Sequence, residues 1–103
     1  MQRRIGDRSR EATAIDGVGE AYQDLGRSAE AADFHRQAAA VHRRLGDSWQ
    51  AAVALHNLAT ALAATGREAE ALSVRQEALT LLSRFEDDRA ADLREQIERA
   101  LTP

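Results

Sequence analysis

The chain contains no cysteine, no lysine and a single proline, and aromatic residues make up only 4% of its 103 positions. Without cysteine it has neither a disulfide framework nor a thiolate-ligated metal site. The scarcity of aromatics and the net charge of −3 argue against a nucleic-acid surface, which needs stacking platforms and an excess of basic groups. No run of about 18 apolar residues and no signal-peptide core are present, so we expect a cytoplasmic protein that does not enter a membrane.

Alanine, leucine, arginine and glutamate are the residues that dominate the composition. These residues lose least on entering a helix, so the composition predicts an all-α fold. All 14 basic residues are arginine. Because arginine and alanine have GC-rich codons and lysine does not, this bias indicates a high-GC bacterial genome, which is a statement about origin and not about chemistry.

The sequence repeats itself with a period of 40 residues. Leu45-Gly46-Asp47 echoes Ile5-Gly6-Asp7, and Ala69-Glu70-Ala71 echoes Ala29-Glu30-Ala31. A fixed period of this length is typical of an array in which each unit is one supersecondary element. The chain is therefore better described as repeats than as one irregular domain.

Glycines divide each unit into two stretches of helical length, which predicts helices over residues 8–25, 28–45, 48–65 and 68–85. Gly26 and Gly66 follow these stretches, where a helix commonly ends in a left-handed residue. Asp7 and Asp47 are N-cap candidates, because a short acceptor side chain binds the free N–H groups of a first turn. A fifth helix, residues 88–101, falls outside the register, and we expect it to cap the last pair.

Apolar residues recur at intervals of three and four, so one face of each helix is expected to be buried. In the first and third stretches this face comprises Ile15, Val18, Tyr22, Leu25, Leu55, Leu58 and Leu62. In the second and fourth it comprises Ala31, Phe34, Ala38, Val41, Leu45, Ala71, Val74, Ala78, Leu81 and Phe85. Gly19 and Ala59 lie on the same side, and small residues there let neighbouring helices approach closely.

The spacing of Ile15, Val18, Gly19 and Tyr22, repeated by Leu55, Leu58, Ala59 and Leu62, resembles the tetratricopeptide repeat. The 40-residue period is similar to a long-helix subclass of that family, and the composition resembles arrays of actinobacterial regulators. The resemblance implies a right-handed α-solenoid of antiparallel helix pairs with about five helices. The expected parts are a tail of a preceding repeat, two repeats and a capping helix, at residues 1–7, 8–47, 48–87 and 88–103.

Arrays of this family imply a concave groove, lined by the first helix of each pair, that takes an extended or helical peptide. The residues beside the buried stripe of these helices form the candidate peptide-binding site: Asp16, Glu20, Gln23, Asp24, His56, Asn57 and Thr60. The resemblance gives Asn57 a specific role, since an asparagine at this position of the long-period subclass hydrogen-bonds the peptide backbone. A carboxamide suits that role because it both donates and accepts.

Asp16, Glu20 and Asp24 are four residues apart and place three carboxylates on one helix face. Two interpretations stay open: a solvated surface, or a patch for a basic peptide or partner helix. The chaperone-tail-binding subclass carries lysine, asparagine and arginine at these places, so the acidic set argues against that partner. Because exposed sites usually tolerate substitution, replacing Asp16 and Glu20 by arginine is expected to leave folding nearly unchanged, within about 0.5 kcal/mol.

His35 and His42 lie about 10 Å apart along one predicted helix, so no shared metal ion is expected. His56 lacks a nucleophile and an orienting acid, which argues against catalysis. We therefore predict a non-enzymatic interaction module without a cofactor, which binds a peptide or partner domain within a larger bacterial transcriptional regulator or similar signalling protein. The alternative is a structural module whose end faces self-associate, since repeat arrays need about three units or protective caps.

Overall fold

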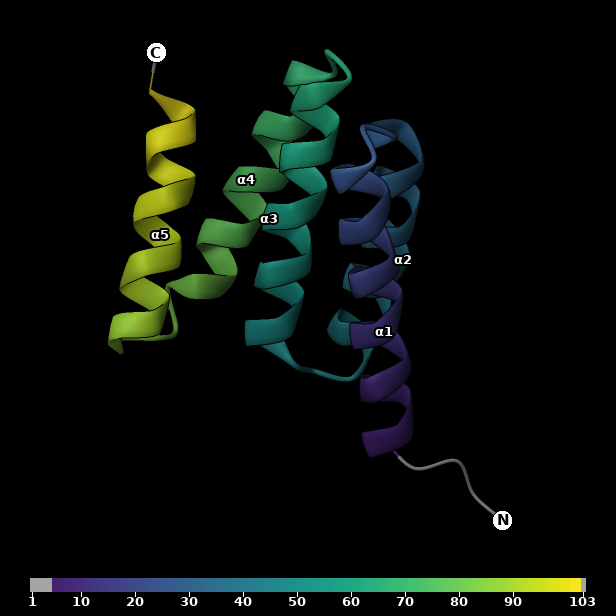
Figure 1. The fold of residues 1–103 in the computed structure, drawn as a ribbon. Coiled ribbons are helices and arrows are strands. Elements are labelled where there is room, and N and C mark those ends of the chain that lie inside the picture. Colours follow the sequence, from purple (N-terminus) through teal and green to yellow (C-terminus); the bar gives the residue numbers. More distant parts are fainter. Residues whose placement is uncertain (1–4, 103) are drawn as a thin grey trace.

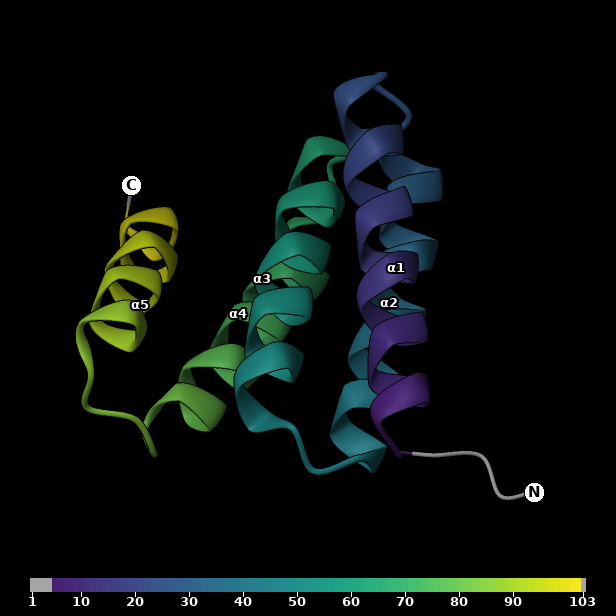
Figure 2. The same ribbon diagram turned by 60° about the horizontal axis from the view of Figure 1, so that its bottom comes forward.

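A computed structural model describes residues 5–102 of the chain as five α-helices. They are α1 (Ile5–Asp24), α2 (Ser28–Arg44), α3 (Ser48–Ala64), α4 (Glu68–Leu82) and α5 (Asp88–Leu101). Successive helices are antiparallel; α1 and α3 form one layer, and α2 and α4 lie behind them (Figures 1 and 2). The helices stack in chain order into an elongated body of 50 × 33 × 20 Å. None of the described helices is long and apolar enough to cross a membrane.

The predicted all-α architecture of five helices is confirmed, and each observed helix end lies within three residues of its predicted position. Asp47 caps α3 as expected, because its Oδ1 accepts a hydrogen bond from the Gln50 N–H at 3.1 Å. Asp7 is different: α1 begins before it, and its side chain pairs with Arg10 inside the helix. Residues 5–7 of the predicted tail thus belong to α1, and residues 1–4 lie outside the described part of the chain.

Left-handed glycines end the first three helices. Gly26, Gly46 and Gly66 have φ values of +77°, +74° and +81°. Each lets the next residue's N–H turn back onto the helix, as Asp47 does to the His42 carbonyl at 2.9 Å. This pattern satisfies carbonyls that the end of a helix leaves free. It also makes each connection short, so that consecutive helices must pack as antiparallel neighbours.

The core is built largely from alanine. Leu55, Leu58 and Leu62 are buried on α3, the central helix, as their spacing predicted. Around them lie buried alanines of α2, α3 and α4: Ala31, Ala32, Ala38, Ala39, Ala52, Ala54, Ala59, Ala61, Ala71 and Ala78. Small side chains at the contacts bring the helix axes close, so few large residues are needed to fill the interior.

The predicted buried face of α1 is wrong at two positions. Val18 is 43% exposed and Leu25 is 71% exposed. Their environment differs from that of α3, where Leu58, which occupies the position of Val18 one repeat later, is 2% exposed. The reason is that α3 packs between α2 and α4, whereas the described α1 packs mainly on α2. The same spacing of apolar residues therefore gives a buried face on α3 and a partly exposed face on α1.

The last helix attaches differently from the others. Its apolar residues Ala90, Leu93 and Ile97 join the common core. Arg94 Nη2 donates to the carbonyls of Leu82 and Phe85 at 3.1 and 3.0 Å. A side chain of α5 thereby satisfies carbonyls at the end of α4, which has no left-handed glycine.

Candidate functional site

An open depression of about 460 Å³ lies between α1 and α3. Six of the seven predicted site residues line it: Glu20, Gln23 and Asp24 from α1, and His56, Asn57 and Thr60 from α3. His35 completes the wall from α2, in the layer behind (Figure 1). Residues up to 40 positions apart in the sequence thus form one surface, because the repeat places equivalent helix faces side by side.

Asp16, the seventh predicted residue, faces inward. Its side chain is only 15% exposed. The Oδ1 atom accepts a hydrogen bond from His35 Nδ1 at 2.5 Å, and Oδ2 accepts one from Asn57 Nδ2 at 3.0 Å. One carboxylate therefore joins α1, α2 and α3. Its replacement by arginine removes this junction, so the expectation that such a change leaves stability unaltered does not hold for Asp16.

Gly19 makes this arrangement possible. A Cβ at this position would lie 2.7 Å from Cε1 of His35 and 2.8 Å from its Nδ1. Carbon atoms in contact normally stay about 3.5–4.0 Å apart. The missing side chain is what admits the imidazole, whose own surface is 2% exposed. The sequence analysis rejected a metal-binding role for His35 and did not predict its contact with Asp16. The sequence feature that accompanies this contact is Gly19 on the facing helix.

Two polar atoms of the depression have no internal partner. Within residues 5–102, neither Gln23 Oε1 nor His56 Nδ1 makes a hydrogen bond, although both atoms are covered. Burial lowers the pKa of His56 below its usual value, and the nearby charge of Arg75 lowers it further. The imidazole is therefore neutral at pH 7, with one nitrogen that donates and one that accepts.

The two sides of the depression differ in charge. On the α1 side Glu20 and Asp24 are exposed, and neither forms an ion pair in the described part of the chain. On the α3 side the groups are neutral: Asn57, Thr60 and His56. The Thr60 hydroxyl donates to the His56 carbonyl at 3.1 Å and keeps its lone pairs free to accept. This arrangement suits hydrogen bonding to a peptide and attraction of a cation.

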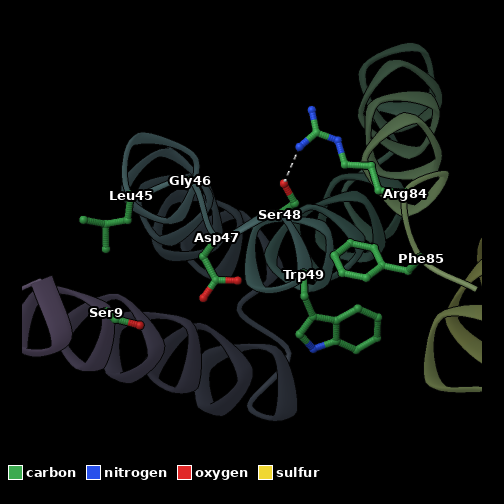
Figure 3. A pocket seen from close by; sticks show the side chains of 8 residues that line it. All are labelled: Ser9, Leu45, Gly46, Asp47, Ser48, Trp49, Arg84 and Phe85. Carbon is green, nitrogen blue, oxygen red and sulfur yellow. Dashed lines mark hydrogen bonds between the residues drawn. The ribbon is translucent and has the colours of Figure 1, made fainter. Parts of the chain in front are cut away.

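A second and larger hollow, of about 580 Å³, lies at the edge where α2 joins α3. Figure 3 shows Trp49 and Phe85 on one side of it and Leu45 and Ser9 on the other. The two rings meet edge to face with centroids 6.1 Å apart, and Arg89 stacks on the indole at 3.8 Å. These groups hold the α2–α3 and α4–α5 junctions, so we regard the smaller, more polar depression as the better candidate site.

The comparisons with known proteins agree with this architecture. Residues 9–84 match the model of the tetratricopeptide repeat. The search of curated proteins and the search of solved structures found no match. The matched span includes the whole depression and both helix pairs except the first residues of α1. On this evidence the chain belongs to the tetratricopeptide repeat family.

Proposed function

We propose that the depression between α1 and α3 binds an extended peptide of a partner protein, with a basic side chain of that peptide against Glu20 and Asp24. Tetratricopeptide repeats generally mediate protein–protein interactions and are typically non-catalytic. The peptide mode goes beyond that family property. It rests on one observation above all: polar groups of two helices converge on one open surface while Gln23 and His56 leave buried atoms unpaired.

Buried polar atoms without partners are costly, so a site that holds them favours a ligand that supplies hydrogen bonds. A peptide backbone offers donors and acceptors at regular spacing, and both kinds are needed here. The Asn57 carboxamide donates to Asp16 through one hydrogen, which leaves its oxygen available as an acceptor within the described structure. Asn57 is thus held in place by the protein and still able to bind a backbone N–H.

The test begins with selection of peptides from a displayed random library on the purified protein. Affinities of the selected peptides are then measured for the wild type, for the double variant Glu20→Arg with Asp24→Arg, and for a control. The control is Asp33→Arg with Glu68→Arg, which changes net charge equally at exposed residues of α2 and α4. We expect the first variant to lose about tenfold or more in affinity and the control to keep it.

Chemical-shift mapping locates the bound peptide independently of any substitution. Perturbed amides should cluster on α1 and α3 around Glu20, Asn57 and Thr60. Equal affinities of the two charge-reversed proteins, or shifts concentrated around Trp49, would contradict the proposal. The affinity for basic peptides should also fall as salt rises, since the carboxylates are exposed and screened.

Self-association is the second candidate function, and the exposed stripe of α1 favours it. Val18 and Leu25 share that stripe with the exposed Ala14 and Ala21, whereas the equivalent residues Leu58, Ala54 and Ala61 are buried. Two copies that pair α1 against α1 would cover it. Sedimentation analysis should then show a dimer that Val18→Glu with Leu25→Glu dissociates, while Leu72→Glu on α4 leaves it intact. A wild type that stays monomeric at its highest soluble concentration would eliminate this function.

The placement of the module in a larger bacterial regulator stays a prediction. It rests on the arginine-only basic composition and on the resemblance in the sequence. Capture of the parent protein's partners with and without this segment, read by mass spectrometry, is the experiment that tests it.

A further inference from the structure

Because the sequence repeats every 40 residues, each position of the first unit can be compared with its equivalent in the second unit. In the first unit Asp16 of α1 meets His35 of α2, with Nδ1 and Oδ1 2.5 Å apart. The equivalent positions of the second unit are His56 of α3 and Arg75 of α4. An acid–imidazole pair in one unit is therefore replaced by an imidazole–guanidinium pair in the next. The second unit keeps two nitrogen-bearing side chains and has lost the carboxylate.

Arg75 shows the consequence of this loss. Within residues 5–102 it forms no ion pair or hydrogen bond, and its Nε is covered without a partner. Two arginines of α2, in contrast, pair with carboxylates of α4: Arg36 contacts Glu70 at 3.0 Å, and Arg43 pairs with Glu77. A half-buried guanidinium with a covered, unpaired nitrogen is the kind of group that an external anion satisfies.

We propose that His56, in the wall of the depression, and its neighbour Arg75 of α4 together bind a carboxylate of the partner peptide, which takes the place that Asp16 occupies in the first unit. This inference rests on the proposed function, since it names a second chemical feature of the same peptide. It assigns Arg75, which no sequence pattern singled out as a site residue, to ligand recognition. It also assigns His56 the part of a neutral donor beside the bound oxygen.

The charges along the surface fit a peptide that carries opposite charges at its two ends. Going from the first unit to the second, Glu20 is replaced by Thr60 and Asp24 by Ala64, so the acidic character stops at α1. Arg75 of α4 is not one of the residues that line the depression, but it adds a positive charge beside His56, which does line it. A peptide with a basic residue near α1 and an acidic residue near α4 therefore meets a complementary charge at each end, and the reversed peptide meets like charges.

The first arm of the experiment tests whether Arg75 lacks a carboxylate, and it needs no peptide. His56→Asp restores the acid at the position equivalent to Asp16, and His56→Asn is the matched neutral control. We expect the melting temperature of the Asp variant to exceed that of the Asn variant by roughly 4 °C or more, the shift of one hydrogen bond to a charged group in a domain of this size. Equal melting temperatures, or a less stable Asp variant, would overturn the inference.

The second arm uses acetylated and amidated decapeptides of alanine, each with one Lys and one Glu at varied separation, and a matched set with Gln in place of Glu. The wild type should prefer the best Glu peptide about tenfold over its Gln partner. Arg75→Gln and His56→Asp should both lose that preference. Arg84→Gln serves as the control, because Arg84 is an exposed arginine that forms no ion pair and whose side chain hydrogen-bonds only Ser48 within the described chain.

The outcomes separate the two proposals. Peptides that bind in the depression with equal affinity whether they carry Glu or Gln overturn the carboxylate site and leave the proposed function standing. The NMR titration of His56 adds a direct readout, since a bound carboxylate should raise the pKa of its imidazole and a Gln peptide should not. If sodium acetate or phosphate alone produces the same shift and displaces the Glu peptide at millimolar concentration, the occupant is a free anion and the peptide assignment falls.

Discussion

Gly19→Ala is the sharpest test of how the helices of this protein meet, because Gly17 offers a matched control two residues away. Both glycines lie inside α1. A Cβ at Gly17 would have no atom within 4 Å, whereas one at Gly19 would lie 2.7–2.9 Å from three atoms of the His35 ring. The same chemical change in the same helix should therefore have opposite effects on the free energy of unfolding.

The magnitudes follow from the gain in helix propensity, the cost of the clash and the loss of a hydrogen bond. Replacing glycine by alanine inside a helix favours folding by about 0.5–1 kcal/mol, and at Gly17 nothing opposes this gain. At Gly19 the ring must move by close to 1 Å, in a buried site where overpacking costs about 1–3 kcal/mol. If the movement also breaks the contact of His35 with Asp16, about 1.5–3 kcal/mol more is lost. We expect Gly19→Ala to be about 1–3 kcal/mol less stable than the wild type and about 2–4 kcal/mol less stable than Gly17→Ala.

Urea unfolding followed by far-ultraviolet circular dichroism measures these differences directly. A second comparison isolates the clash: in a His35→Ala background the obstructing ring is gone, so Gly19→Ala should become neutral or stabilising. If Gly19→Ala matches Gly17→Ala in the wild-type background, the close approach of α1 and α2 at this point is refuted.

Three further predictions test other parts of the structure. Leu58→Ala removes a buried side chain from the central helix and should lower the free energy of unfolding by about 2–5 kcal/mol, measured by urea titration. A loss of less than about 1 kcal/mol would show that Leu58 is not in a packed core. Asp16→Ala leaves the donors of His35 and Asn57 without their acceptor and should lower the free energy of unfolding by about 1.5–3 kcal/mol. Glu20→Ala should change it by no more than about 0.5 kcal/mol in the same assay. Similar losses for both variants would contradict the three-helix junction. Because the pKa of His56 is lowered in the folded protein, the unfolded chain binds more protons below about pH 6.5, so stability should fall as pH decreases through that value. Melting curves at pH 7.5 and 5.5 should show a smaller fall for His56→Gln than for the wild type, and equal falls would exclude His56 as a source of the pH dependence.

The helices were predictable because their signals are local. Glycine after the first three apolar stretches and aspartate before the third are recognised within a few residues of the helix end, and the backbone there adopts the conformation that those residues favour. The candidate site was predictable for a related reason, since the repeat places equivalent faces side by side. Six of the residues chosen from the groove that the family resemblance implies, beside the buried stripe of the first helices, line one depression.

Burial and pairing were less predictable, because they depend on what a helix packs against. Val18 and Leu58 occupy equivalent positions with similar side chains, yet only Leu58 is covered. Asp16 follows the same spacing as Glu20, but it faces inward because Gly19 brings His35 within reach. No periodicity in one helix carries information about the helix that meets it.

The sequence by itself determined the number of helices, their ends to within three residues and the alignment of the two units, since backbone capping and the 3.6-residue period act within a single segment. The tertiary structure alone decided which carboxylate of the acidic face became internal, which histidine was admitted by a glycine, and which arginine was left without an acid. Those outcomes arise where three helices meet, and the free energy of a buried charge or hydrogen bond depends on all the groups around it.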